Sequence, residues 1–109
     1  MNDPNLRTRL MFPPFNMGPR RSQVAALLVE AGAVTTLELI DRVWGGRKDD
    51  AINGLVKVTI HLVRRDLKAA LGFDPVLTIR GAHTYAIEPL NCERIKKLAF
   101  KTTTGDDSE

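Results

Sequence analysis

The spacing of hydrophobic residues changes at Asp74, and this change restricts the fold more than any other feature of the sequence. Before it, apolar residues recur every three or four positions over residues 51–71, which predicts a long helix. After it, residues 76–80 and 84–87 are rich in β-branched and aromatic side chains. Residues 81–83 between them begin with glycine and are short enough for a tight turn, so the sequence predicts a β-hairpin directly after a long helix.

The predicted long helix has one apolar side and one cationic side. The apolar positions expected to face the core are Val56, Ile60, Val63, Leu67 and Leu71. The opposite side carries Lys57, His61, Arg64, Arg65 and Lys68. Gly54 has a low helix propensity, which predicts a first turn that begins after Ala51. The cationic side is suited to a polyanionic partner; the alternative is a solvated surface whose arginines pair with Asp66 or Glu30.

Two shorter helices are predicted ahead of the long one. The first begins at residues 18–19, with proline in its first turn, and ends at Gly32. Thr35 and Glu38 have the spacing of a capping box, which predicts the start of the second helix, and residues 45–46 are glycines that end it. The residues expected on its inward side are Leu37, Ile40, Val43 and Trp44.

Both ends of the chain are predicted to lie outside this unit. Residues 1–18 contain several prolines, which exclude a continuous helix and predict an irregular arm. The apolar residues of the arm are expected to pack on the body, the alternative being an exposed motif for a partner: they are Leu10, Met11, Phe12 and Phe15. Residues 91–100 predict a short helix capped by Asn91, and residues 101–109 are expected to be disordered.

Composition excludes several classes of protein. The chain has 109 residues, with 16 Lys and Arg against 13 Asp and Glu, and three of the acids lie at its C-terminal end, so its body is basic. Cys92 is the only cysteine, which excludes an internal disulfide and, with only two histidines, a closed zinc site; we expect it to be a small core residue. No Gly-rich phosphate loop, activated thiol or carboxylate pair is visible, so we expect neither an enzyme nor a cofactor or metal.

Four blocks of sequence in this order resemble the DNA-binding effector domain of OmpR/PhoB-type transcriptional regulators. They are Gly18-Pro19, VTTLELI with VWG over residues 34–45, VKVTIHLVRRDL over residues 56–67, and TIRG over residues 78–81 with Tyr85. The resemblance covers residues 17–87. It implies an α+β, mainly α fold: a winged helix-turn-helix with three helices and a C-terminal β-hairpin wing. The expected divisions are an arm over 1–16, the winged-helix domain over 17–90 and a C-terminal extension over 91–109.

The resemblance also implies how DNA is bound. The helix over about 53–71 is expected in the major groove and the wing over about 76–88 at the minor groove. The implied DNA-binding residues are Lys57, Thr59, His61, Arg64, Arg65, Lys68, Thr78, Arg80, His83 and Trp44. Arginine suits guanine edges and phosphates, a threonine methyl suits thymine, and Arg80 is expected to sense a narrow minor groove.

Three departures limit what the resemblance implies. Leu62 and Thr59 stand where family members often have arginine and histidine, so different bases are expected to be read. The wing is one residue longer before Tyr85, and residues 1–16 leave no room for a receiver domain, so control by phosphorylation is not expected.

The sequence thus predicts a cytoplasmic, nucleoid-associated regulator of bacterial or phage type. It lacks an apolar run of roughly 20 residues and a signal-peptide pattern, so no membrane association is expected. Its expected partner is double-stranded DNA, bound as a monomer or a homodimer, with RNA polymerase or another regulatory protein as a further partner. The alternative function is a winged-helix protein-interaction module that contacts such a partner through residues 45–50, the arm or the C-terminal segment.

Overall fold

The computed structural model describes residues 4–79 and 81–104, with side chains over 6–79 and 81–100. Its elements are α1 (Pro4–Arg9), α2 (Pro19–Ala31), β1 (Ala33–Thr35), α3 (Thr36–Val43), α4 (Ala51–Leu71), β2 (Val76–Ile79), β3 (Thr84–Ile87) and α5 (Pro89–Thr104). The protein is a small, mainly helical α+β domain with a three-stranded antiparallel sheet in the order β1-β3-β2.

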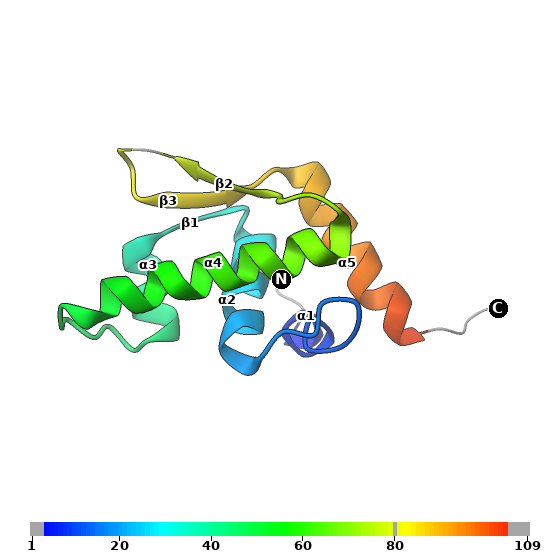
Figure 1. Ribbon diagram of the computed structural model, residues 1–109, viewed down its shortest axis with the longest axis horizontal. Coiled ribbons are helices and arrows are strands. Elements are labelled where there is room, and N and C mark those ends of the chain that lie inside the picture. Colours follow the sequence, from blue (N-terminus) through cyan, green and yellow to red (C-terminus); the bar gives the residue numbers. More distant parts are fainter. Residues whose placement is uncertain (1–3, 80, 105–109) are drawn as a thin grey trace.

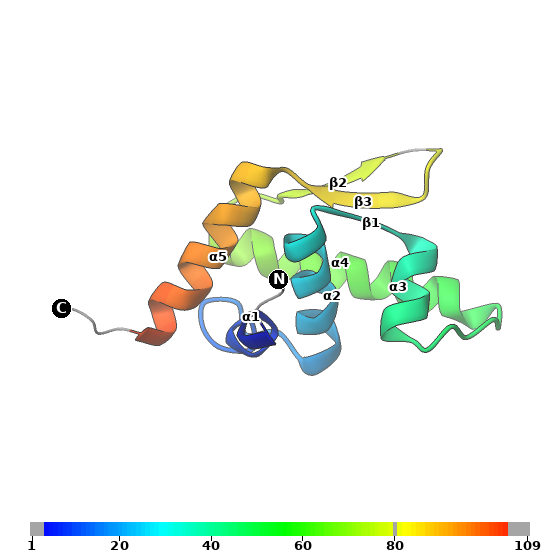
Figure 2. The same cartoon turned by 180° about the vertical axis from the view of Figure 1, so that it is seen from behind.

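The sheet lies along one side of the helices, and α1 lies on the opposite side (Figure 1). The long helix α4 runs beneath the sheet, with α3 near its N-terminal end and α5 near its C-terminal end. Seen from behind, α2 crosses α4 between α3 and α5 (Figure 2). The hairpin and one side of α4 therefore lie at the same edge of the molecule.

A single hydrophobic core joins these layers. The largest of its fully buried side chains are Leu6, Leu10, Leu28, Leu39, Leu67, Ile87 and Ile95. They come from α2, α3, α4, α5 and β3, as well as from α1 and the turn that follows it. The arm and the C-terminal helix are consequently part of the core, because both supply side chains that are almost inaccessible to solvent.

The predicted apolar side of α4 is confirmed for most of its length. Its buried positions are Ile52, Val56, Ile60, Val63 and Leu67. Leu71 is only half-buried, since it stands at the last turn before Gly72 ends the helix with a φ of 90°. The expectation of a late start was wrong: α4 begins at Ala51, because the burial of Ile52 outweighs the low propensity of Gly54.

The inward side of α3 differs from the expectation at one residue. Leu37 is 77% exposed, and Leu39 is fully buried in its place. The capping box is present as predicted, with the Thr35 hydroxyl accepting from the Glu38 amide and the Glu38 carboxylate accepting from the Thr35 amide. With the helix fixed to begin at Thr36, Leu37 falls on the side opposite Leu39 and Val43.

The strand β1 was not predicted. It pairs with β3 in an antiparallel register that sets Val34 opposite Tyr85, and the Val34 side chain is buried. Three residues are too few to show the alternating pattern of a strand. The strand can therefore be identified only from its pairing with β3. It converts the predicted hairpin into the three-stranded sheet and fixes the base of the hairpin on the helices.

Both chain ends are more helical than predicted. A short helix, α1, forms where an irregular arm was expected, because proline at its first position needs no amide hydrogen bond and Leu6 is buried. The arm packs on the body as predicted through Leu10 and Phe15, whereas Met11 and Phe12 are exposed.

The C-terminal helix is longer than the sequence indicated. It begins at Pro89, so Asn91 lies inside it and is not its cap. Residues 101–104, expected to be disordered, continue the helix, while 105–109 lie outside the described residues. Ile95 and Ala99 are fully buried. Their packing against α1 and α2 stabilises a helix that the local sequence alone favours only weakly.

Candidate nucleic-acid interface

The solvent side of α4 carries several exposed basic side chains. Lys57, His61 and Lys68 are exposed, and the side chain of Arg65 is 61% exposed. Within residues 6–79 and 81–100, neither lysine has an acidic oxygen within 4.0 Å. Four of the predicted DNA-binding residues therefore share one accessible helix side.

The single acid of α4 faces away from the centre of this side. Asp66 accepts a 2.8 Å hydrogen bond from Arg21 of α2, and its side chain is 12% exposed. Arg65 approaches the other carboxylate oxygen at 3.5 Å. The sequence had left open a solvated surface whose arginines pair with Asp66 or Glu30. Arg65 does approach Asp66 in this way, although most of its side chain remains in solvent.

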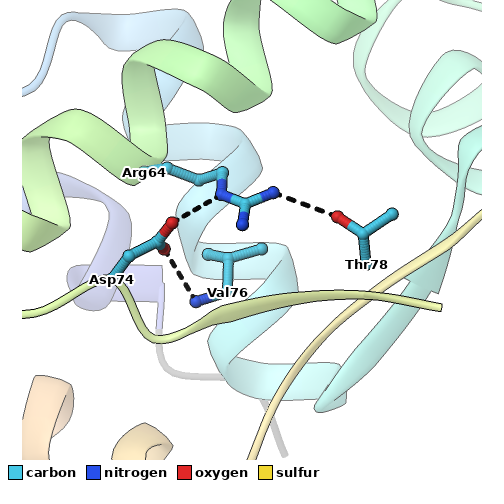
Figure 3. A network of polar contacts seen from close by, with 4 residues as sticks. All are labelled: Arg64, Asp74, Val76 and Thr78. Atoms are coloured by element: carbon cyan, nitrogen blue, oxygen red, sulfur yellow. Dashed lines mark hydrogen bonds and ion pairs between the residues drawn. The ribbon is translucent and has the colours of Figure 1, made fainter.

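Arg64 differs from the sequence expectation of an outward, unpaired cation (Figure 3). Its Nε donates to Oδ2 of Asp74 at 2.7 Å, and its Nη1 donates to the Thr78 hydroxyl at 3.0 Å. The other Asp74 oxygen accepts from the Val76 amide at 3.0 Å. We call this network the Arg64–Asp74 link; it ties α4 to the loop before β2 and to the middle of that strand.

The link was missed because its members are ten residues apart across a helix end. Helical spacing reveals pairs three or four residues apart, and here the chain reverses at Gly72 before Asp74 returns alongside. In the sequence, Asp74 marked only the change in hydrophobic spacing. Two predicted site residues, Arg64 and Thr78, are consequently brought into contact with each other, with part of their hydrogen-bonding capacity already used.

An open cleft of about 430 Å³ lies between the hairpin and the first half of α4. Three predicted residues line it together: Lys57 from α4, Thr78 from β2 and His83 from the turn. Asn53 and Tyr85 line it as well, and the sequence reasoning had not assigned them to the site. The cleft presents an ammonium group, an imidazole and hydroxyl groups to whatever enters it.

The turn of the hairpin is fixed to α3. His83 has a φ of 48°, an uncommon left-handed conformation, and its carbonyl accepts from the Thr36 amide at 2.8 Å and the Thr36 hydroxyl at 3.3 Å. These bonds hold the exposed His83 beside the cleft. Arg80, the other cation predicted at this turn, lies outside the described residues.

Thr59 and Trp44 lie apart from the cleft. Thr59 is half-buried, and its hydroxyl donates to the Leu55 carbonyl at 2.7 Å, so the helix itself uses that group. Trp44 is half-buried at the end of α3, packed against the core, with the Arg20 guanidinium 5.4 Å from its ring. Its expected role as a core residue is confirmed.

The one cysteine is buried, as expected. Cys92 is 6% exposed, and its thiol donates to the Ile87 carbonyl at 3.4 Å. Burial raises the pKa of the Cys92 thiol, which keeps it protonated and unreactive. At the start of α3, the hydrogen bonds from Thr35 lower the pKa of Glu38.

No group of three or more His, Cys, Asp or Glu residues in the described ranges is arranged to hold a metal ion. None of the helices over those ranges combines the length and apolar character that crossing a membrane requires. No family model matches the chain, and no curated protein and no solved structure matches it.

Proposed function

We propose that this protein is a sequence-specific double-stranded DNA-binding regulator of transcription with a winged helix-turn-helix plan. In this proposal, α3 and α4 form the helix-turn-helix, α4 enters the major groove, and the β2–β3 hairpin is the wing beside the adjacent minor groove. The protein acts as a binding protein, without catalysis and without a cofactor.

The observation that carries the proposal is the arrangement around the 430 Å³ cleft. A helix whose exposed lysines have no acidic partner among the described side chains and a hairpin lie on the two sides of this cleft, and residues of both, Lys57 and His83, line it. A DNA strand separates a major groove from the neighbouring minor groove, so a helix in one and a hairpin at the other leave the strand between them. Phosphates of that strand are the ligand that the cleft's ammonium and hydroxyl groups suit.

The dimensions of α4 support the same function. Its 21 residues span roughly 31 Å, and a helix with its side chains is about 10–12 Å across, the width of the major groove. Residues 44–50 connect it to α3, and the core side of α4 is fully committed to packing. The cationic side is therefore free to meet DNA without any change in the fold.

Selection of bound duplexes from a genomic fragment library, followed by fluorescence anisotropy on a selected duplex, tests the proposal. Specific binding is expected to weaken with salt, because each phosphate that a cation neutralises contributes about −0.9 to the slope of log affinity against log salt. Lack of enrichment of any sequence, together with salt-independent retention, would contradict DNA binding.

A second candidate function is a protein-interaction module that contacts RNA polymerase or another regulator. One observation favours it: the strongly exposed Leu37 borders a second cleft of about 430 Å³, formed by α3, the loop over residues 45–50 and the start of α4. An exposed leucine beside a cleft suits an apolar side chain of a partner protein. Purified polymerase captured by wild type and released by Leu37→Asp would support this function, alone or together with DNA binding.

A further inference from the structure

The outward side of α4 contains apolar residues among its cations. Val58 is 57% exposed and Leu55 is 41% exposed, while Leu62 is half-buried. Large aliphatic side chains on a solvent-facing helix surface are costly to hydrate unless a partner covers them. Within the described residues, Val58 and Leu55 are left largely uncovered, whereas Leu62 is partly covered and exposes only its outer part.

Two contacts define which way this surface points. Arg64 reaches β2 on one side of α4, and Asp66 reaches α2 on the other. At 100° per residue, Val58 and Leu62 lie between these two contacts on the side away from the core. The surface they form is thus turned neither to the sheet nor to α2.

Apolar and cationic side chains alternate on this surface. Val58 is three residues from His61 and four from Leu62, and Arg65 is three residues from Leu62 and four from His61. Residues at these separations are neighbours on a helix. The four side chains therefore form one outward patch, which contains two aliphatic groups, an imidazole, a guanidinium and no acid.

We propose that Val58 and Leu62 read thymine by contact with its C5 methyl group, an inference that rests on the proposed binding of DNA. The methyl group is an apolar feature that only A·T pairs present in the major groove, and the adjacent Arg65 guanidinium and His61 imidazole can donate hydrogen bonds to the phosphates beside it. The exposed Arg65 guanidinium beside these aliphatic groups, with Asp66 largely buried behind it, is complementary to the negative surface of a duplex.

The spacing of the two residues defines what is read. Helical neighbours have their Cβ atoms about 5–6 Å apart, and successive base pairs are about 3.4 Å apart, so the two methyl groups lie one or two base steps from each other. The preferred site therefore contains a pair of closely spaced thymines. Thr59, whose methyl group was the sequence-based candidate for this contact, is half-buried on the α2 side of the helix.

Deoxyuridine substitution tests this inference, because deoxyuridine lacks only the C5 methyl group and keeps its base pairing. The probe is a duplex recovered by the selection, with thymines replaced one at a time by deoxyuridine. Each of two replacements is expected to weaken wild-type binding about fourfold, the value that burial of one methylene-sized group implies. Val58→Ala and Leu62→Ala are expected to bind the thymine duplex more weakly and each to become insensitive to one of the two replacements.

Leu90→Ala is the matched control, since Leu90 is a 69% exposed aliphatic residue on α5. It is expected to keep the wild-type response to deoxyuridine, and circular dichroism checks that all three variants fold. Specific binding with no response to any replacement would overturn the inference and leave the proposed function intact, whereas absence of specific binding would overturn both. Self-association of wild type that Val58→Ala abolishes would overturn it too, by showing that a second copy covers the patch.

Discussion

Replacing Arg64 by alanine is expected to destabilise the fold, and this prediction is the most direct test of the Arg64–Asp74 link. The change removes a 2.7 Å ion pair to Asp74 and a 3.0 Å hydrogen bond to Thr78. Both partners of the ion pair keep about a third of their side-chain surface in solvent, 34% for Arg64 and 32% for Asp74. Screening by water therefore reduces the benefit of the pair well below that of a buried one.

The expected magnitude follows from these exposures. An exposed ion pair contributes about 0.2–1 kcal/mol, and hydrogen bonds to charged groups contribute about 1.5–3 kcal/mol when they are well shielded. For a link that is about one-third exposed and contains two such bonds, we expect the free energy of unfolding to fall by about 1–2 kcal/mol. In a domain of this size, that loss lowers the melting temperature by roughly 4–10 °C.

Thermal unfolding followed by circular dichroism measures the loss. Lys57→Ala is the control, because Lys57 is an exposed α4 cation without an acidic partner in the described part of the chain. Asp74→Asn is expected to have a smaller effect than Arg64→Ala, since its amide oxygen can still accept from Val76. Both variants test the same link from opposite ends.

DNA binding provides the result that would refute this reasoning. Counterions leave the DNA when a protein cation neutralises a phosphate, and a guanidinium already paired with a carboxylate does little of this, so Arg64→Ala is expected to weaken specific binding while leaving the salt slope unchanged. If Arg64→Ala melts at the wild-type temperature and reduces the magnitude of the slope by about one unit, Arg64 is a free phosphate contact and the link has no structural role.

Four further predictions follow from individual residues. Ile60→Ala, at a site that is 4% exposed, is expected to cost about 2–4 kcal/mol in urea unfolding; an unchanged midpoint would mean that the core side of α4 is misassigned. Lys57→Ala is expected to reduce the magnitude of the salt slope for DNA binding by about one, measured by anisotropy, with no change in melting temperature. Cys92 is expected to react with a thiol reagent only as fast as the protein unfolds, because burial raises its pKa, and rapid labelling of the native protein would contradict this. Because the pKa of Glu38 is lowered, its ionised carboxylate contributes stability above pH 4.5, and this stability is lost as the pH falls. The difference in melting temperature between wild type and Glu38→Gln is therefore expected to narrow below pH 4.5. A difference that stays constant with pH would argue against the capping box.

Local signals in the sequence determined the elements that carry the proposed function. The three- and four-residue spacing from Val56 to Leu67 defined α4 and its buried side, because a helix places those positions on one face irrespective of what covers them. The capping box of Thr35 and Glu38 located the start of α3, since its two hydrogen bonds are made within four residues. The hairpin was located in the same way, from β-rich runs on either side of a short turn.

Tertiary structure alone decided which residues share the candidate site. Arg64 and Asp74 meet only after Gly72 reverses the chain, and Lys57 shares a cleft with His83 only because the hairpin folds back over α4. No periodicity along the chain encodes such contacts, since they depend on the relative position of two packed elements.

The same reason explains the elements that the sequence did not predict. Three residues of β1 become a strand because β3 supplies their hydrogen bonds, and α1 becomes a helix because α2 and α5 bury Leu6. The accessible apolar patch at Val58 likewise emerged only when the neighbours of α4 were known: a sequence shows that a residue is apolar, whereas the packed structure determines whether anything covers it.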